Sequence, residues 1–159
     1  MTKKAYFASP LFSEMELMYN DYLVKEIKQK FSALDLYVPQ EQTEINDKNA
    51  YADSIMIAKM DTDQLLSCDF MIAVLDGAAI DVGVATEIGV AYQAGIPIVG
   101  LYTDSRQQGA TNQKKLEALQ EIAESQFSYI NLYTVGIVKT NGTIVNTAAE
   151  LLKAITPYC

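Results

Sequence analysis

Three carboxylates follow one another after a short apolar run, and their spacing suits chemistry on a bound ligand. Residues 70–75 are apolar throughout, which is typical of a buried parallel strand. Asp76 comes directly after this run, Asp81 can cap a helix over 82–94, and Glu87 lies within that helix. The carboxyl ends of parallel strands border the ligand crevice of an open α/β sheet. We therefore expect all three acids at or near the crevice, where they favour a neutral or cationic polar ligand over a phosphate.

Glu87 is the strongest candidate for a catalytic residue. Its neighbours in the helix are small or apolar, so the surrounding surface is not generally charged. Gly83 and Gly89 lie within the same helix, where each costs ~1 kcal/mol relative to alanine, and such glycines indicate close approach of a ligand or another backbone. On spacing alone, a solvated glutamate explains Glu87 equally well. Asp81 could be only a helix cap, and Asp76 only a turn residue.

Two further residues could join these acids. Asp61 lies late in a predicted helix over 48–67, close enough in sequence to the strand at 70–75 to reach the crevice. Tyr6 lies on the first predicted strand, and its phenol could orient a carboxylate. The ordinary alternatives are a solvated aspartate and a core tyrosine.

The chain contains no histidine, which restricts its chemistry. Ser-His-Asp and Cys-His catalysis and the usual histidine zinc sites are excluded. Acid–base and nucleophilic work falls to Asp, Glu, Tyr, Lys or Cys. The glycine fingerprints of dinucleotide-binding and phosphate-binding loops are also missing, and we expect neither a metal nor a cofactor.

Composition indicates a single domain over residues 1–159, in the reduced setting of the cytoplasm. A formal net charge of −8 argues against nucleic acid and anionic membranes as partners. No apolar stretch reaches the ~18 residues of a membrane span, and the N-terminus lacks the features of a signal peptide. Two cysteines, Cys68 and Cys159, make no disulfide framework.

The elements that must position the candidate residues alternate between strand and helix. Strands are expected at 5–8, 36–38, 70–75 and 97–102, and helices at 13–31, 48–67, 82–94, 112–124 and 147–155. A fifth strand is expected within 129–138, and Asn141-Gly142 is a hairpin signal. The inward residues of the first helix are expected to be Leu17, Tyr22 or Leu23, Ile27 and Phe31, and those of the helix at 112–124 to be Leu116, Leu119 and Ile122. The pattern predicts an α/β fold, a flavodoxin-like doubly wound five-stranded parallel sheet with helices on both faces.

The central block reads Asp76-Gly77, then Asp81-x-Gly83-x3-Glu87-x-Gly89-x-Ala91, then Gly95-x-Pro97. The order and spacing of this block resemble the nucleoside 2-deoxyribosyltransferase family. Outside the block the resemblance is thinner but covers most of the chain: it extends to Tyr6-Phe7-Ala8, Tyr37-Val38-Pro39, Asp61 and Asn131-Leu132-Tyr133.

The resemblance implies an exchange of the base on a 2'-deoxyribonucleoside through a covalent deoxyribosyl-glutamate intermediate. Glu87 matches the nucleophile, and Tyr6 the tyrosine that positions it. Asp61 matches an acid that meets the base or assists its protonation, and Asp81 the residue that binds a sugar hydroxyl. Without the family name, a carboxylate suits this reaction because it can stabilise and trap an oxocarbenium-like sugar.

The resemblance also implies a homo-oligomer, a dimer or a hexamer, whose active site is shared between subunits. Asn131 and Tyr133 fall in the stretch that a neighbouring subunit lends to the site, at the 5' end of the sugar. Asp76, Gly83 and Gln42 complete the set expected to bind substrate. The expected partners are 2'-deoxyribonucleosides and free purine or pyrimidine bases.

Two other functions stay open. A related hydrolase would cleave 2'-deoxynucleoside 5'-monophosphates and would need a phosphate pocket, for which the loops offer Ser9, Ser13, Ser105 and Arg106. A non-catalytic binding module of the same fold would not need Glu87. Family members often end in a tyrosine that reaches the active site, whereas here Tyr158 is penultimate.

Overall fold

A five-stranded parallel sheet forms the centre of the molecule. The computed structural model describes residues 2–42, 51, 53–107, 111–125 and 129–159. The strands lie in the order β2-β1-β3-β4-β5, and all neighbours are parallel. Their bounds are β1 Lys4–Ala8, β2 Asp35–Tyr37, β3 Phe70–Val74, β4 Ile98–Leu101 and β5 Gly142–Val145. This order confirms the predicted flavodoxin-like, doubly wound α/β fold.

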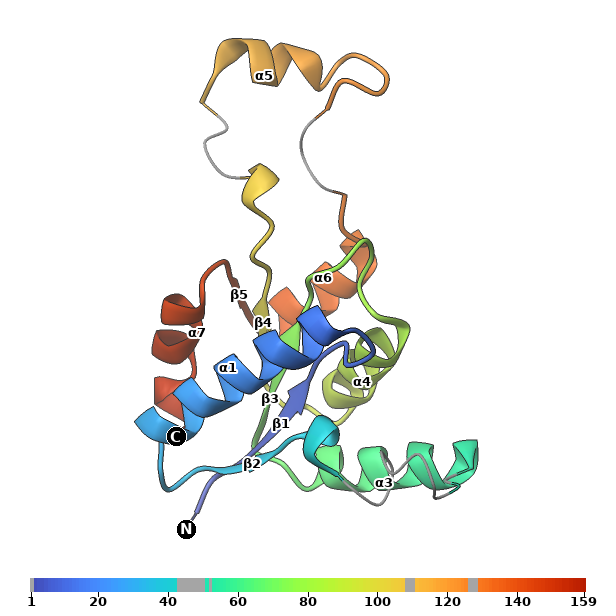
Figure 1. Ribbon diagram of the computed structural model, residues 1–159, viewed down its shortest axis with the longest axis vertical. Helices are drawn as coiled ribbons and strands as arrows, with labels where there is room; N and C mark the ends of the chain where they lie inside the picture. Colours follow the sequence, from blue (N-terminus) through green and yellow to red (C-terminus); the bar gives the residue numbers. More distant parts are fainter. Residues whose placement is uncertain (1, 43–50, 52, 108–110, 126–128) are drawn as a thin grey trace.

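Helices cover both faces of the sheet (Figure 1). Their bounds are α1 Glu14–Lys30 and α7 Ala148–Ala154 on one face, and α3 Ser54–Leu66, α4 Val82–Gln93 and α6 Leu132–Thr140 on the other. Side chains alternate along β1, so Ala5 and Phe7 pack toward α1 and α7, whereas Tyr6 and Ala8 pack toward α3, α4 and α6. Tyr6 therefore points to the face on which Glu87 and Asp61 lie.

The sequence explains where α1 begins. Ser13 accepts a hydrogen bond from the backbone of Glu16, and the carboxylate of Glu16 accepts one from the backbone of Ser13, so the two residues form a capping box. Leu23 and Ile27 are buried, whereas Tyr22 is 48% exposed, so the inward choice at this turn is Leu23.

The fifth strand is not where the sequence pattern put it. Residues 132–140 form α6, because Asn131 caps the helix by accepting a hydrogen bond from the backbone of Thr134. Val135 and Val138 are buried on the inner face of this helix. The last strand is β5, and Gly142 pairs with Ile98 of β4 in parallel. The hairpin prediction at Asn141-Gly142 is therefore wrong.

The predicted helix over 112–124 is also shorter than expected. The helix α5 covers Gln113–Ala118, and Figure 1 draws it at the top of the view, apart from the sheet. Leu116, Leu119 and Ile122 are 37%, 40% and 99% exposed, so the prediction that they face inward is wrong. A helix of 6 residues that lies apart from the sheet has no core to cover.

The remaining elements are short or begin later than predicted. Asp53 caps α3 through the backbone of Met56, so this helix begins at Ser54. Residues 48–50 and 52 of the predicted helix lie outside the described residues. Single 3-10 turns lie at Pro39–Glu41, Ser105–Gln107 and Thr156–Tyr158. Within the described part of the chain, no helix combines the length and apolar character needed to cross a membrane.

Candidate active site

A phenol and a carboxylate meet beside the centre of the sheet. The hydroxyl of Tyr6 donates a hydrogen bond of 2.6 Å to Oε1 of Glu87. Tyr6 is fully buried on β1, and Glu87 projects from the middle of α4. Val84, Ile88 and Ala91 form the buried face of that helix, and Glu87 lies beside them on the turn between Val84 and Ile88. The packing of α4 on the sheet therefore holds the carboxylate against the phenol.

A second phenol and carboxylate lie next to the first pair. The hydroxyl of Tyr37 donates a hydrogen bond of 3.2 Å to Oδ1 of Asp61. Asp61 precedes the buried Leu65 by one turn of α3, so both face the sheet. Tyr37 is the register partner of Tyr6 on the neighbouring strand, and the two rings stack with centroids 5.4 Å apart. The four residues form one cluster, which we call the tyrosine–acid cluster: Tyr6, Tyr37, Asp61 and Glu87.

The cluster changes the protonation of its members. Burial raises the pKa of Glu87 to about 7, the bond from Tyr6 opposes this rise, and the charges of Asp61 and Asp81 add to it. Burial also raises the pKa of Asp61, while the bond from Tyr37 lowers it. Near neutral pH, a proton can therefore reside on Glu87 or leave it.

The two phenols are hydrogen-bond donors throughout the neutral range. Burial and the neighbouring carboxylates raise the pKa of Tyr6 and the pKa of Tyr37. A phenol that keeps its proton can hold one oxygen of a carboxylate in place. The arrangement can therefore orient a carboxylate nucleophile and a nearby acid.

Asp81 lies at the N-terminus of α4 and acts on Glu87 through its charge. Its Oδ1 accepts hydrogen bonds from the backbones of Gly83 and Val84, at 2.9 and 3.1 Å. A Cβ at Gly83 would lie 3.0 Å from this same oxygen, so glycine leaves room for the cap. A Cβ at Gly89 would meet no described atom within 4 Å. Of the two reasons expected for this glycine, a ligand or another backbone, close approach of another backbone is therefore not found.

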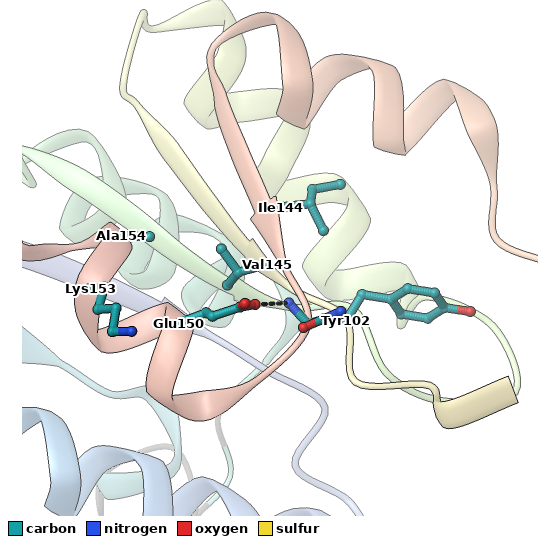
Figure 2. Close-up of a pocket in the computed structure, with 7 residues that line it drawn as sticks. Tyr102, Ile144, Val145, Glu150, Lys153 and Ala154 are labelled. Atoms are coloured by element: carbon teal, nitrogen blue, oxygen red, sulfur yellow. Dashed lines mark hydrogen bonds between the residues drawn. The ribbon is translucent and has the colours of Figure 1, made fainter. Parts of the chain in front are cut away.

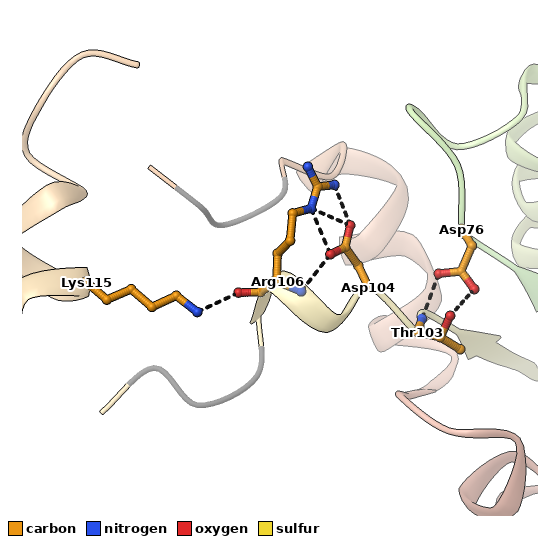
Figure 3. A network of polar contacts seen from close by, with 5 residues as sticks. All are labelled: Asp76, Thr103, Asp104, Arg106 and Lys115. Carbon is orange, nitrogen blue, oxygen red and sulfur yellow. Dashed lines mark hydrogen bonds and ion pairs between the residues drawn. The ribbon is translucent and has the colours of Figure 1, made fainter. Parts of the chain in front are cut away.

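Asp76 joins the ends of two strands instead of reaching into the cluster. Its carboxylate accepts hydrogen bonds of 2.7 Å from both the backbone and the hydroxyl of Thr103, as Figure 3 shows. In the same loop, the guanidinium of Arg106 is paired with the carboxylate of Asp104. The carboxyl ends of β3 and β4 are thereby tied together, at the end of the sheet where the ligand crevice is expected.

The other three residues predicted to bind substrate, and Tyr158, also lie outside the cluster within this chain. Asn131 caps α6, and Tyr133 in the first turn of that helix is 79% exposed. The amide of Gln42 donates to the backbone oxygen of Val38, at 3.0 Å. Tyr158 stacks on Phe70, at the start of β3, with ring centroids 5.2 Å apart. Phe70 is at the amino end of β3, so Tyr158 lies at the opposite end of this strand from Asp76.

Tyr37 is the member of the cluster that was not predicted as a site residue. The signal was present, because Tyr6 and Tyr37 both sit within short strands that the pattern identified. Their parallel pairing puts them directly opposite each other. This pairing depends on the register between β1 and β2, and the sequence of either strand alone does not determine that register.

A cavity of about 560 Å³ lies on another part of the molecule (Figure 2). It is lined by Tyr102, Ile144, Val145, Asn146, Glu150, Lys153 and Ala154. The carboxylate of Glu150, in the first turn of α7, accepts a hydrogen bond of 3.3 Å from the backbone of Asn146. Within the described ranges, no group of three or more Cys, Asp or Glu side chains could hold a metal ion.

Comparisons with known proteins identify the family of the chain. Residues 5–132 match the family model for nucleoside 2-deoxyribosyltransferase, and all four positions of the tyrosine–acid cluster lie within this range. No curated protein matches the chain.

Solved structures give the same fold. A conserved protein from Enterococcus faecalis V583 is 58% identical, with a TM-score of 0.94 and full coverage of both chains. A 2-deoxyribosyltransferase from Leishmania mexicana is 18% identical over 98% of each chain, with a TM-score of 0.65. A CMP N-glycosidase from Clostridium botulinum is 18% identical over 99% of this chain and 100% of that one, with a TM-score of 0.52. The extent of the family match shows that the chain belongs to the nucleoside 2-deoxyribosyltransferase family.

Proposed function

We propose that the protein transfers the 2'-deoxyribosyl group of a nucleoside from one base to another, with Glu87 as the nucleophile. The observation that carries this proposal is the 2.6 Å bond from Tyr6 to Oε1 of Glu87. The bond engages one carboxylate oxygen, so Oε2 is the oxygen that attacks the sugar. The family membership supports the same chemistry.

In the first half-reaction, Oε2 of Glu87 bonds to C1' as the bond from C1' to the base nitrogen breaks. The electron pair of that bond leaves with the base, and Asp61 supplies the proton that the base takes up. The product is a glycosyl ester, as in retaining glycosidases. The transition state carries positive charge on the sugar, which the carboxylates of Glu87 and Asp81 stabilise.

In the second half-reaction, a nitrogen of the acceptor base attacks C1', and the ester bond to Glu87 breaks. The electron pair returns to the carboxylate, whose negative charge the phenol of Tyr6 stabilises by hydrogen bonding. The acceptor nitrogen gives its proton to Asp61, which restores the enzyme. No step requires a metal or a histidine.

The substrate pocket is completed by residues outside the cluster. We assign Asp81 to a sugar hydroxyl, with Gly83 beside it and with Asp76 at the crevice edge, and we place Gln42 near the base. Asn131 and Tyr133 act in the site of a neighbouring subunit of a homo-oligomer. The high exposure of Tyr133 supports this assignment, because the side chain is available to a second copy.

Hydrolysis of a nucleoside monophosphate fits the site less well. The charges of Asp61 and Asp81 act on Glu87, and the three carboxylates together would repel a phosphate. Arg106, the cation of the nearest loop, is already paired with Asp104. A neutral nucleoside is the better substrate for such surroundings.

A base-exchange assay tests the proposal. The protein is incubated with 2'-deoxyadenosine and excess cytosine, and separately with thymidine and adenine, and the products are separated by chromatography. We expect a new deoxynucleoside that forms with wild type and not with Glu87→Ala. Free deoxyribose without exchange would show a hydrolase, and no reaction in either mixture would overturn the proposal.

A further inference from the structure

The acid that protonates the leaving base must itself be held in one orientation. Asp61 is partly buried on the side of α3 that faces the sheet, and its carboxyl group can rotate unless another group fixes it. The described contact that does so is the 3.2 Å bond from the hydroxyl of Tyr37 to Oδ1. Oδ2 is then the oxygen left to exchange a proton with the base.

We propose that Tyr37 is a positioning residue for this transfer, which orients Asp61 so that Oδ2 gives its proton to the leaving base and stabilises the carboxylate that remains. The proposal rests on the deoxyribosyl transfer proposed above. Tyr37 keeps its own proton throughout, and the proton of Oδ2 moves to the base nitrogen as the bond to C1' breaks. The same proton balance runs in reverse when the acceptor base arrives.

The ring of Tyr37 is held in place by packing, so the proposed role belongs to its hydroxyl. The ring stacks on the ring of Tyr6, with centroids 5.4 Å apart, and packs with the buried residues between the sheet and α3, α4 and α6. Phenylalanine at this position keeps the ring and its packing and removes only the hydroxyl. Tyr37→Phe therefore isolates the bond to Asp61 from the architecture around it.

The bond also has a defined effect on the acid. A donor to Asp61 favours the charged carboxylate, and the bond from Tyr37 lowers the pKa of Asp61 against the raising effect of burial. Without the hydroxyl, Asp61 holds its proton more tightly. Proton transfer to the base becomes harder, although the nucleophile Glu87 keeps its own partner.

The first test compares two leaving groups. One substrate is 2'-deoxyadenosine with cytosine as acceptor, whose adenine needs a proton to leave. The other is 4-nitrophenyl 2-deoxyriboside, whose leaving group departs as a stable anion. For Tyr37→Phe we expect kcat to fall about tenfold with the first substrate, the size of one lost bond to a charged group, and KM to stay within about twofold. With the second substrate we expect kcat to stay within about twofold.

Matched variants separate this role from a general loss of structure. Tyr22→Phe removes a hydroxyl from a tyrosine that is 48% exposed on α1, and we expect no change with either substrate. In an Asp61→Asn background, Tyr37→Phe should have no further effect, because the acid it positions is gone. Equal losses of kcat with both substrates, or a full additional loss in the Asp61→Asn background, would overturn the proposal.

A second measurement does not depend on activity. The pKa of Asp61 can be followed by carbon NMR of the carboxyl group in wild type and in Tyr37→Phe. We expect a higher pKa in the variant, and an equal or lower pKa would overturn the inference. An inactive wild type with a raised pKa of Asp61 in the variant would instead contradict the proposed transfer while leaving the positioning contact in place.

Discussion

Tyr6 and Glu87 are 81 positions apart in the chain, and the hydroxyl of the first lies 2.6 Å from Oε1 of the second. The contact joins the central region of the sheet to the middle of α4. Burial raises the pKa of Glu87 to about 7, and the phenol partly offsets that rise. A buried carboxylate that is only partly ionised at neutral pH is a feature typical of catalytic sites.

Glu87→Gln should remove activity and stabilise the fold. We expect base exchange to fall by at least about 10³-fold, because glutamine cannot form the glycosyl ester. The folded-state pKa of Glu87 is raised, so wild-type stability is lost as pH rises from about 4.5 to about 7. At pH 8 the variant should be more stable by up to about 3 kcal/mol, at about 1.4 kcal/mol per pH unit.

Urea unfolding at pH 8 and at pH 4 measures this difference. At pH 4 wild type carries a protonated Glu87, and the two proteins should have nearly equal free energies of unfolding. A variant that is less stable than wild type at pH 8 would contradict the assigned pKa. Lys59→Gln, which breaks an exposed ion pair with Asp63, is a control expected to change stability by less than about 1 kcal/mol.

Removal of the Tyr6 hydroxyl should move the pH dependence of activity. The nucleophile must be ionised, so kcat/KM of wild type should fall below an apparent pKa near 7. Tyr6→Phe removes a contact that lowers this pKa, so the acid limb should shift to higher pH. Asp81→Asn removes a charge that raises it and should shift the limb to lower pH. Shifts in the same direction for both variants would show that Glu87 does not control the limb.

Loss of the Asp76 carboxylate should loosen the crevice edge. Asp76→Ala removes two hydrogen bonds of 2.7 Å to Thr103, and we expect unfolding to become easier by about 2 kcal/mol. Thr103→Val removes only the hydroxyl bond and should cost about half as much. Thermal unfolding monitored by circular dichroism measures both. If Asp76→Ala proves as stable as wild type, the bonds to Thr103 do not hold this edge.

Two inactive variants should restore activity to each other if the site is shared. Tyr133 is 79% exposed, so Tyr133→Ala leaves the fold of its own subunit intact while removing a group from the neighbouring site. Glu87→Gln supplies an intact Tyr133 but no nucleophile. A mixed oligomer contains some sites with both residues, and we expect partial activity after the variants are mixed. Light scattering of wild type should give a mass of two or more chains, whereas a monomer with no complementation would contradict the shared site.

The sequence predicted those parts of the fold whose signals are local. The capping box at Ser13 and Glu16 marked the start of α1, and Asp81 marked the start of α4. Apolar runs marked β1, β3 and β4. The prediction of a fifth strand within 129–138 was wrong because these residues are rich in types common in strands. The cap by Asn131 and packing against the sheet instead favour a helix from Leu132 onward.

The sequence and its family resemblance singled out three of the four residues of the tyrosine–acid cluster, and missed the one whose position depends on strand pairing. Glu87, Asp61 and Tyr6 come together as predicted. Tyr37 was missed as a site residue because only the register of β1 and β2 brings it opposite Tyr6. The roles of Asn131 and Tyr133 depend on a second subunit, and Gln42 precedes residues outside the described part of the chain. The roles of these three residues, like those of the other candidate site residues, stay predictions.

The most direct test of the central claim is the mass of the protein during turnover. Wild type is mixed with 2'-deoxyadenosine alone, quenched in acid within one turnover and examined by intact-mass spectrometry, with peptide mapping of any adduct. The account predicts a gain of one deoxyribosyl group on the peptide that contains Glu87, and none in Glu87→Gln. Base exchange without such an adduct, or an adduct on another residue, would contradict it.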